Sequence, residues 1–291
     1  MTGLSFAYGS NGLGDHRLAD ACAFLADEGY DGIALTLDHQ HLDPFGPDLD
    51  HRVDEVRRLL DDHALSVVVE TGGRFVLDPR NKHEPTLVSP EGADRRVDFY
   101  RRAVDICVRL GSPVLHLWSG VDRAGDADAA WGRLTDGLGS VLDAAAEAGI
   151  VVGLEPEPGM VVDTIATWER LLDQLSHPAL AMTLDIGHCQ CLEDAPIADC
   201  IQRVADHLVH VQIEDMVRGV HEHLPFGDGE IDFPPVMAAL QDIGYDGLVS
   251  VELTRHGHTA HTMVPEAIRF LRAATPTVTS TPDQTNGRVP A

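Results

Sequence analysis

Acidic side chains lie at the carboxyl ends of four short apolar segments in this sequence. They are Glu70 in LSVVVET, Glu155 in VVGLEP, Asp185 in AMTLDIGH and Glu252 in LVSVEL. Apolar segments of this kind form buried strands, and a carboxylate there is costly to desolvate without a partner. If these strands converge, their carboxylates repel one another, and a divalent cation is the simplest group that holds them together. The sequence therefore predicts a metalloenzyme.

Three of the carboxylates, Glu155, Asp185 and Glu252, are hard oxygen donors that belong to three different strands. With a fourth, neutral ligand they suit Mn²⁺, Mg²⁺, Co²⁺ or Zn²⁺. The alternative interpretation is that each carboxylate forms its own ion pair. Few Lys or Arg residues lie near these strand ends in the sequence, and we therefore prefer the metal site.

Histidines gather near the same strand ends. His188 follows Asp185 by three residues, and His221 and His223 are two residues apart in RGVHEHLPFG, which places them on one side of an extended segment. His188 has a plainer interpretation as a helix cap, and His116, within VLHLW, as a hydrogen-bonded core residue. We expect His188, His221 and His223 to converge on one pocket, either on substrate oxygens or on a second metal ion.

The segment RFVLDPRNKHEPTLVS, residues 74–89, is long for a connection between a strand and a helix, which usually has about 2–6 residues. It carries Arg74, Arg80, Lys82 and His83 in an otherwise acidic chain. Two interpretations remain open. The segment is either a lid that brings cations to an anionic or polyhydroxyl substrate, or an ordinary solvated loop.

Short apolar segments alternate with amphipathic ones along the chain, eight of each, which predicts an α/β fold, a single-domain (β/α)8 TIM barrel over residues 1–274. In such barrels the active site lies at the carboxyl ends of the strands, where the polar residues above fall. A doubly wound sheet is the alternative, but Gly9, Gly12 and Gly14 match its phosphate-binding turn only weakly. Residues 275–291 are rich in Thr and Pro and predict a disordered tail.

The composition of the chain restricts the kinds of molecule that it can be expected to bind. The chain has 291 residues with 21 Lys and Arg against 47 Asp and Glu, and the net charge of −26 disfavours nucleic acid and anionic lipid. The sequence has neither an apolar segment long enough to span a membrane nor a recognisable signal peptide. The five cysteines form no paired framework. We therefore expect a cytoplasmic protein with buried thiols, without nucleic-acid or membrane partners.

Several segments together resemble the xylose isomerase-like TIM barrels, which include ketohexose 3-epimerases, inosose dehydratases and isomerases, and the endonuclease-four type of nuclease. The resemblance covers roughly residues 4–273 and is specific in the order and spacing of its motifs. These motifs are LEP at Glu155, LDIGH at Asp185, HVQIEDMVRGVH at 210–221, FGDGEIDF at 226–233 and SVEL at Glu252.

The resemblance implies a metal ion held by Glu, Asp, His and Glu from strands five to eight. Glu155, Asp185 and Glu252 match three of these positions, and Gln212 stands at that of the His. His210 lies two residues earlier and one layer deeper, so we expect Gln212 to complete the metal shell, with an altered metal preference. In the epimerases the two Glu ligands are also the acid/base pair, which assigns catalysis to Glu155 and Glu252.

The resemblance also implies residues that bind the substrate. A His after the Asp and an Arg after strand seven hold the substrate in the epimerases, and the nuclease branch uses further metal ligands on strands three and four and after strand seven. Together with the strand-end residues, these positions give the predicted substrate-binding set: Glu70, His116, Glu157, His188, Arg218, His221 and His223.

These features favour a metal-dependent isomerase or epimerase that acts on a sugar, keto-sugar or cyclitol by proton transfer through an enediolate. A lyase or dehydratase acting on a keto-sugar or keto-glycoside would use the same residues. A metal-dependent phosphodiesterase and a non-catalytic sugar- or metal-binding protein are less favoured. We expect one divalent ion, Mn²⁺ before Zn²⁺, Co²⁺ or Mg²⁺, with room for a second. The expected partner is a small carbohydrate or cyclitol, and a homo-oligomer remains open.

Overall fold

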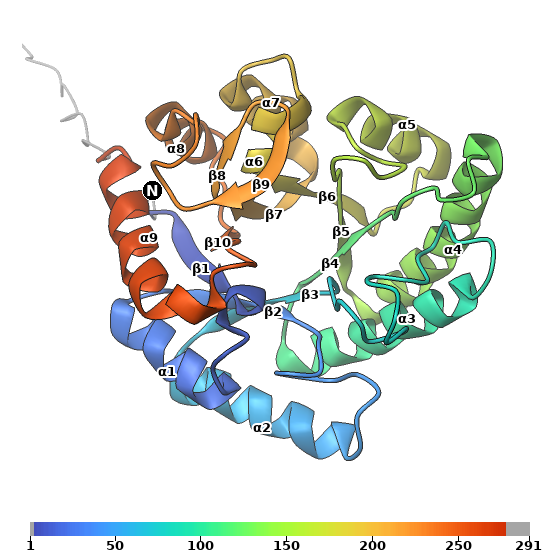
Figure 1. Ribbon diagram of the computed structural model, residues 1–291, viewed down its shortest axis with the longest axis horizontal. Coiled ribbons are helices and arrows are strands. Elements are labelled where there is room, and N and C mark those ends of the chain that lie inside the picture. Colours follow the sequence, from blue (N-terminus) through green and yellow to red (C-terminus); the bar gives the residue numbers. More distant parts are fainter. Residues whose placement is uncertain (1–2, 278–291) are drawn as a thin grey trace, which may run out of the picture.

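Eight parallel strands close into a barrel in the computed structural model, which describes residues 3–277. The strands follow the order β1-β10-β7-β6-β5-β4-β3-β2 around the barrel (Figure 1). The predicted (β/α)8 TIM barrel is therefore confirmed. The barrel strands are β1 (Ser5–Gly9), β2 (Gly32–Thr36), β3 (Ser66–Glu70), β4 (Val114–Trp118), β5 (Val151–Glu155), β6 (Leu180–Asp185), β7 (Leu208–Ile213) and β10 (Leu248–Val251).

Helices surround the barrel and connect consecutive strands (Figure 1). Three of them end in a glycine with positive φ, namely Gly29, Gly111 and Gly149, which stops the helix and turns the chain toward the next strand. The eight expected helices are α1 (Leu18–Glu28), α2 (Leu49–Asp62), α3 (Ala93–Leu110), α4 (Ala127–Ala148), α5 (Ile165–Leu175), α7 (Ile197–Val204), α8 (Phe233–Asp242) and α9 (Ala260–Ala274).

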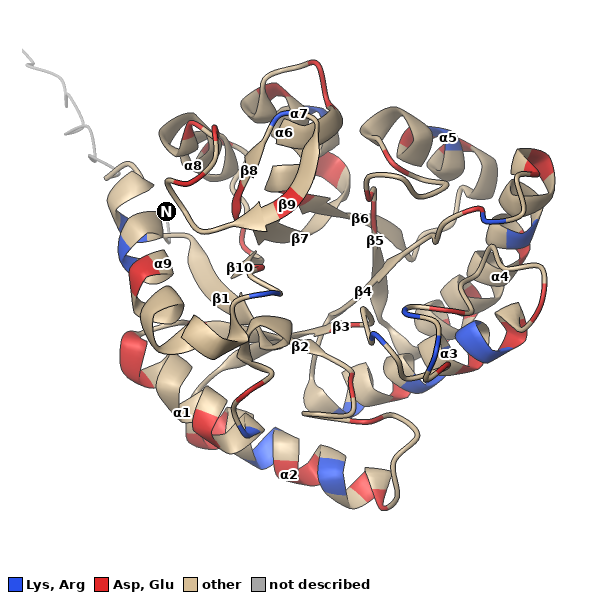
Figure 2. Cartoon of the chain, viewed as in Figure 1, with Lys and Arg blue, Asp and Glu red and all other residues tan. Residues whose placement is uncertain are grey.

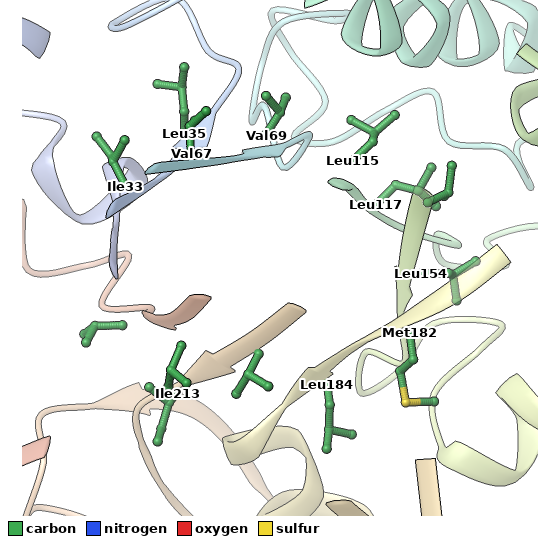
Figure 3. Packing of buried hydrophobic residues seen from close by; sticks show 14 of the residues in the cluster. Ile33, Leu35, Val67, Val69, Leu115, Leu117, Leu154, Met182, Leu184 and Ile213 are labelled. Carbon is green, nitrogen blue, oxygen red and sulfur yellow. The ribbon is translucent and has the colours of Figure 1, made fainter. Parts of the chain in front are cut away.

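The alternation of side chains along each strand delivers the polar residues to the barrel interior. Figure 3 shows apolar side chains such as Leu35, Val69 and Leu117 on the outer side of the strands, where they belong to the main hydrophobic core. Successive side chains of a strand point to opposite faces, so the residues between and beyond these apolar ones face the lumen. The lumen-facing set at the carboxyl end includes Thr36, Glu70, His116, Glu155, Asp185 and Gln212.

Two elements beyond the regular barrel shape its mouth. Helix α6 (Ile186–Leu192) begins directly after Asp185, and strands β8 (Asp215–Val217) and β9 (Val220–Leu224) form an antiparallel hairpin after β7. Asp215 anchors the segment after the hairpin, because its carboxylate accepts hydrogen bonds from the backbone N–H of Gly227 at 2.9 Å and of Ile231 at 3.1 Å. The hairpin therefore lies fixed beside the strand ends.

Charged residues lie both on the outer helices and on the loops at the mouth of the barrel. Figure 2 shows Lys, Arg, Asp and Glu spread over the outer helices, with a few basic and acidic segments on loops around the barrel mouth. Within residues 3–277, none of the helices is both long and apolar enough to cross a membrane. Most of the predicted tail, residues 278–291, lies outside the described residues.

Candidate active site

A pocket of about 370 Å³ opens at the carboxyl end of the barrel. Most of the residues that the sequence singled out line it, although they come from different strands and loops. Asp185 lies just behind the pocket wall, almost fully buried. The predicted residues on the lining are Glu70, His116, Glu155, Glu157, His188, Gln212, His221, His223 and Glu252.

Glu155 is held between two histidines at the end of β5. Its Oε2 lies 2.8 Å from His116 Nε2 and its Oε1 lies 3.1 Å from His188 Nδ1, and all three side chains are buried. Burial alone raises the pKa of Glu155, but the hydrogen bonds with His116 and then His188 outweigh it, and the pKa falls below its usual range. Glu155 is therefore an ionised carboxylate with a fixed orientation.

His188 links Glu155 to the β8–β9 hairpin. Its Nε2 lies 3.0 Å from Nε2 of His221, and the ring of His223 lies 5.9 Å away between centroids. Burial lowers the pKa of His188, but the charges of Asp185 and Glu155 outweigh it and hold the pKa well above its usual value. By contrast, burial and the neighbouring histidines lower the pKa of His221 to about 4. The structure thus brings the three predicted histidines together, and their surroundings shift the pKa of His188 upward and that of His221 downward.

Asp185 and Gln212 present oxygen atoms that the protein leaves free. Asp185 caps α6 through Oδ1, which accepts a hydrogen bond of 2.8 Å from His188 N. Gln212 lies opposite Asp185 in the sheet register and donates its Nε2 to Glu70 Oε1 at 3.0 Å. Among the described residues, Asp185 Oδ2 and Gln212 Oε1 are both buried without a hydrogen-bond partner. Buried oxygen atoms that accept no hydrogen bond are suited to bind a cation or a substrate hydroxyl group.

Glu70 orients Gln212 from the neighbouring part of the barrel. Its carboxylate accepts hydrogen bonds from Thr36 Oγ1 at 3.0 Å and Gln212 Nε2 at 3.0 Å, and it lies 3.3 Å from His210 Nε2. Burial raises the pKa of Glu70, but the hydrogen bond with His210 contributes to a net lowering. Because Glu70 fixes the amide nitrogen of Gln212, the amide oxygen must face the other way.

Glu252 lies at the end of β10, three places from β5 around the barrel. Its Oε1 accepts a hydrogen bond of 3.0 Å from Nδ2 of Asn11, which belongs to the short 3-10 helix Ser10–Leu13 after β1. Burial is the main cause that holds the pKa of Glu252 well above its usual range, and the charges of Glu70 and Glu155 add to it. The pKa values of Glu155 and Glu252, the two carboxyl groups of this pocket, are therefore shifted in opposite directions.

Glu214 is a site residue outside the set predicted from the sequence. It is fully buried, and neither of its carboxylate oxygens has a hydrogen-bond partner within the described part of the chain. A Cβ at position 187 would come within 2.0 Å of Glu214 Oε1, so only Gly187 leaves room for this carboxyl group. The signal was available, since Glu214 follows Gln212 by two residues and therefore shares its face of the chain.

Three overlapping groups of residues can hold a metal ion, each with ligand atoms within 4.8 Å of one another. Asp185 belongs to two of them, one shared with Glu155 and the other with Glu252. Carboxylate oxygens and imidazole nitrogens are ligands of Mn²⁺, Zn²⁺ and similar ions, so the donor set fits a divalent cation. The groups are Glu155, Asp185 and His188; Asp185, Glu214, His223 and Glu252; and His188, His221 and His223.

Arg218 is not part of the pocket lining, although the family resemblance implies that it holds the substrate. It lies exposed beside the turn between β8 and β9, and its guanidinium faces the segment after α6. Its Nη1 donates to Gln190 O at 3.2 Å, and its Nη2 donates to Asp194 Oδ1 at 3.0 Å. The hairpin, which the sequence analysis treated as a plain extended loop, turns this side chain away from the barrel mouth.

Replacing Glu214 with Gln should stabilise the protein freed of metal with EDTA, more at about pH 8 than at about pH 5. Burial, and next the charge of Asp185, hold the pKa of Glu214 well above its usual range. The free energy of unfolding of the wild type is therefore largest at acid pH and falls as the pH rises above the ordinary carboxyl range, because the buried Glu214 must then lose its proton or keep it at a cost. Gln carries no such proton, so the variant avoids this loss. A gain of about 1 kcal/mol would raise Tm by roughly 2–4 °C. An equal change of Tm at both pH values would contradict this role.

Replacing Gln212 with His should keep the metal site and shift its preference toward Zn²⁺ over Mn²⁺, because imidazole suits zinc. Gln212→Leu should lower metal content, since it removes the free Oε1. Elemental analysis after dialysis against equal Zn²⁺ and Mn²⁺ measures both effects. His210→Gln, one layer deeper, serves as the control and should leave the preference unchanged. Wild-type loading in both Gln212 variants would exclude Gln212 as a ligand.

Comparison with known proteins adds the family context. The model of the family described as xylose isomerase-like TIM barrel matches residues 22–274. An inosose dehydratase of Lacticaseibacillus casei is 29% identical over 148 residues, which are 45% of this chain and 49% of that protein, so the match spans about half its length. A putative hydroxypyruvate isomerase of Mus musculus is 28% identical over 229 residues, 72% of this chain and 79% of that protein.

Among solved structures, the D-allulose 3-epimerase from Methylomonas sp. in complex with D-allulose superposes with a TM-score of 0.74. It is 21% identical, and the superposition covers 94% of this chain and 98% of that one. At this level of identity the likeness supports the fold alone. The predicted membership in this group of barrels is confirmed by the family match.

Proposed function

Because the chain belongs to the xylose isomerase-like TIM barrel family, a family with epimerases, isomerases and dehydratases, we propose that it is a metal-dependent isomerase or epimerase. Its substrate would be a keto-sugar or cyclitol. The observation that carries the proposal is the pair Glu155 and Glu252, two carboxyl groups from separate strands that line one pocket without a Lys or Arg ion pair among the described residues.

Glu155, Asp185, Gln212 and Glu252 would hold the divalent ion in this proposal. The free Oδ2 of Asp185 and Oε1 of Gln212 support the assignment, since both are buried and lack a hydrogen-bond donor in residues 3–277. A carboxylate-rich donor set favours Mn²⁺. When bound, such an ion supplies Lewis-acid polarisation of a carbonyl and its neighbouring hydroxyl, which makes the C–H between them more acidic.

The side chains of the pocket would then carry the proton. One of the two carboxyl groups, Glu155 or Glu252, removes the proton from the substrate carbon, and the other returns a proton to the opposite face or the adjacent carbon. His116 and His188 hold Glu155 in place by hydrogen bonds of 2.8 and 3.1 Å, and Asn11 holds Glu252. Fixed carboxyl groups need little reorganisation during proton transfer.

A carbohydrate substrate agrees with the relatives. The similar structures include an epimerase with bound D-allulose and one with D-tagatose, and the curated relatives include L-ribulose-5-phosphate 3-epimerases. The lining of the pocket, rich in carboxyl, imidazole and amide groups, offers many hydrogen-bond partners for hydroxyl groups. We therefore place a polyhydroxylated substrate in this pocket.

A dehydratase is the second candidate, and Glu157 favours it. This residue lines the pocket two positions after Glu155, and burial, with the charge of Glu155, raises its pKa to about 7. A carboxyl group with that pKa can protonate a departing hydroxyl near neutral pH. Elimination would then follow the same removal of a proton beside a ketone.

The proposed reaction can be tested with the metal-loaded protein and a panel of ketoses and keto-cyclitols, followed by proton NMR. Interconversion of a substrate with its epimer or isomer would support the first candidate, and loss of water the second. Protein treated with EDTA is the control and should be inactive. Turnover that is equal with and without metal, or no turnover across the whole panel, would count against the proposal.

A further inference from the structure

We propose that the substrate carries an anionic group, a phosphate or a carboxylate, which Arg74, Lys82 and Arg255 bind at the mouth of the pocket. This inference rests on the proposed function, because it concerns the substrate of the same pocket. It adds a charged end to the sugar or cyclitol and assigns the residues that bind it.

The first observation is the position of the three cations. Although acidic residues outnumber basic ones by 47 to 21, Arg74, Lys82 and Arg255 all line the pocket. They come from two loops, one after β3 and the other after β10. The pocket thus has an acidic floor, formed by the carboxyl groups at the strand ends, and a basic rim.

The second observation is that the rim cations lack matching carboxylates. Within residues 3–277, no acidic oxygen lies within 4.0 Å of a side-chain nitrogen of Arg74 or Lys82, and Arg255 has one exposed pair with Glu222 at 3.5 Å. Arg74 instead donates from Nη2 to the backbone carbonyls of Asn11, at 3.0 Å, and Thr254, at 3.4 Å. These bonds position the guanidinium without neutralising it.

The third observation is that the cations lie close enough to repel one another. Burial is the main cause that lowers the pKa of Lys82, and the charge of Arg74 lowers it further, as does that of Arg255, while Glu157 acts in the opposite direction. Like charges brought together at a concave surface create a positive potential that attracts anions. Phosphate and carboxylate groups are the usual partners of such Arg and Lys clusters.

The loop that carries Lys82 is also held in place by hydrogen bonds from a buried residue of α3. Arg96 is fully buried and donates from Nε to Pro85 O at 2.8 Å and from Nη2 to His83 O at 2.6 Å. Its guanidinium packs 5.1 Å from the ring of Trp118, which itself lines the pocket. Lys82 therefore extends from a backbone segment that Arg96 anchors, and the guanidinium of Arg74 is positioned by its own hydrogen bonds.

This polarity also sets the orientation of the substrate. An anion at the floor would face Glu155, Asp185 and Glu252, whereas at the rim it meets the three cations. The oxygens that react would therefore point to the floor, and the anionic group would lie toward the opening. A neutral sugar would leave the rim cations without a partner.

The test compares three probes with one carbon skeleton: D-fructose, D-fructose 6-phosphate and D-fructuronate. Their affinities for the full-length, Mn²⁺-loaded protein are measured by calorimetry, without any need for turnover. We expect at least one charged probe to bind about tenfold more tightly than D-fructose. Lys82→Met should reduce this advantage several-fold and leave the affinity for D-fructose unchanged. Arg80→Gln is the matched control, since Arg80 is an exposed cation of the same loop outside the pocket lining.

The two charged probes show which anionic group the site prefers. Tighter binding of D-fructose 6-phosphate would indicate a phosphate, and tighter binding of D-fructuronate a carboxylate. Equal affinity for all three probes, failure of both charged probes to bind, or equal effects of Lys82→Met and Arg80→Gln would overturn the inference. The outcome is separate from that of the proposed reaction. A charge preference without sugar turnover would refute the isomerase alone, and turnover of neutral sugars without a charge preference would refute the anion site alone.

Discussion

Replacing Glu252 with Gln should lower turnover of the true substrate by about 10²–10⁴-fold, the usual contribution of a general acid or base. Gln keeps the size of the side chain and an oxygen that can accept from Asn11 Nδ2, which lies 3.0 Å from Oε1. It cannot exchange a proton at neutral pH. Most of the metal should remain bound, because the amide oxygen is still a ligand. Turnover and elemental analysis of the same preparation measure the two effects.

The matched control for Glu252→Gln is Glu147→Gln, since Glu147 is an exposed residue of α4 on the outside of the barrel. This control should retain wild-type activity and metal content. Loss of metal and activity together in Glu252→Gln would assign Glu252 to metal binding alone. Full activity with the metal retained would show that proton transfer does not use this carboxyl group.

Removal of the metal should abolish activity and lower Tm by about 5–10 °C. A ligand present at about 100 times its Kd stabilises the folded state by about 2.7 kcal/mol, and each kcal/mol corresponds to about 2–4 °C in a domain of this size. The physical reason is that only the folded chain brings ligand atoms of Asp185, Glu214, His223 and Glu252 within 4.8 Å of one another, so the ion binds the folded state and not the unfolded one. Calorimetry before and after EDTA treatment, with Mn²⁺ added back, measures the change.

Asp185→Asn provides the control for this experiment. Asn can still cap α6 as Asp185 does through Oδ1, because Asn and Asp are both good N-cap residues. The substitution removes one negative charge from the metal site, so EDTA should lower Tm less in this variant than in the wild type. An identical response of both proteins to EDTA, or no response in the wild type, would contradict a metal site at Asp185.

The barrel and much of the pocket could be predicted because one physical rule governs both. Side chains alternate along a strand, so an acidic residue that ends an apolar strand faces the lumen at the carboxyl end. This rule applies to Glu155 and Asp185, and the same alternation of side chains directs Gln212 to the lumen; the structure places all three on or directly behind the pocket wall. It also applies to Glu214, which could have been included on the same grounds.

Contacts between distant loops could not be predicted in the same way. The hydrogen bond from Asn11 to Glu252 joins residues 241 positions apart, and no periodicity in the sequence reports it. The position of Arg218 depends on the β8–β9 hairpin, whose short strands carry little apolar signal. The anchoring of the Lys82 loop depends on Arg96, a buried arginine of α3 that no motif in the sequence distinguishes from the exposed arginines of the same helix.

Deuterium wash-in is the measurement that most directly tests metal-dependent proton transfer in this pocket. A true substrate is incubated in D₂O with the Mn²⁺-loaded protein, with EDTA-treated protein and with Glu252→Gln, and incorporation is followed by proton NMR. Deuterium should enter at the carbon beside the carbonyl only with the loaded wild-type protein, in both substrate and product. Product formed without any deuterium at that carbon, or incorporation that is unaffected by EDTA, would contradict the proposed chemistry.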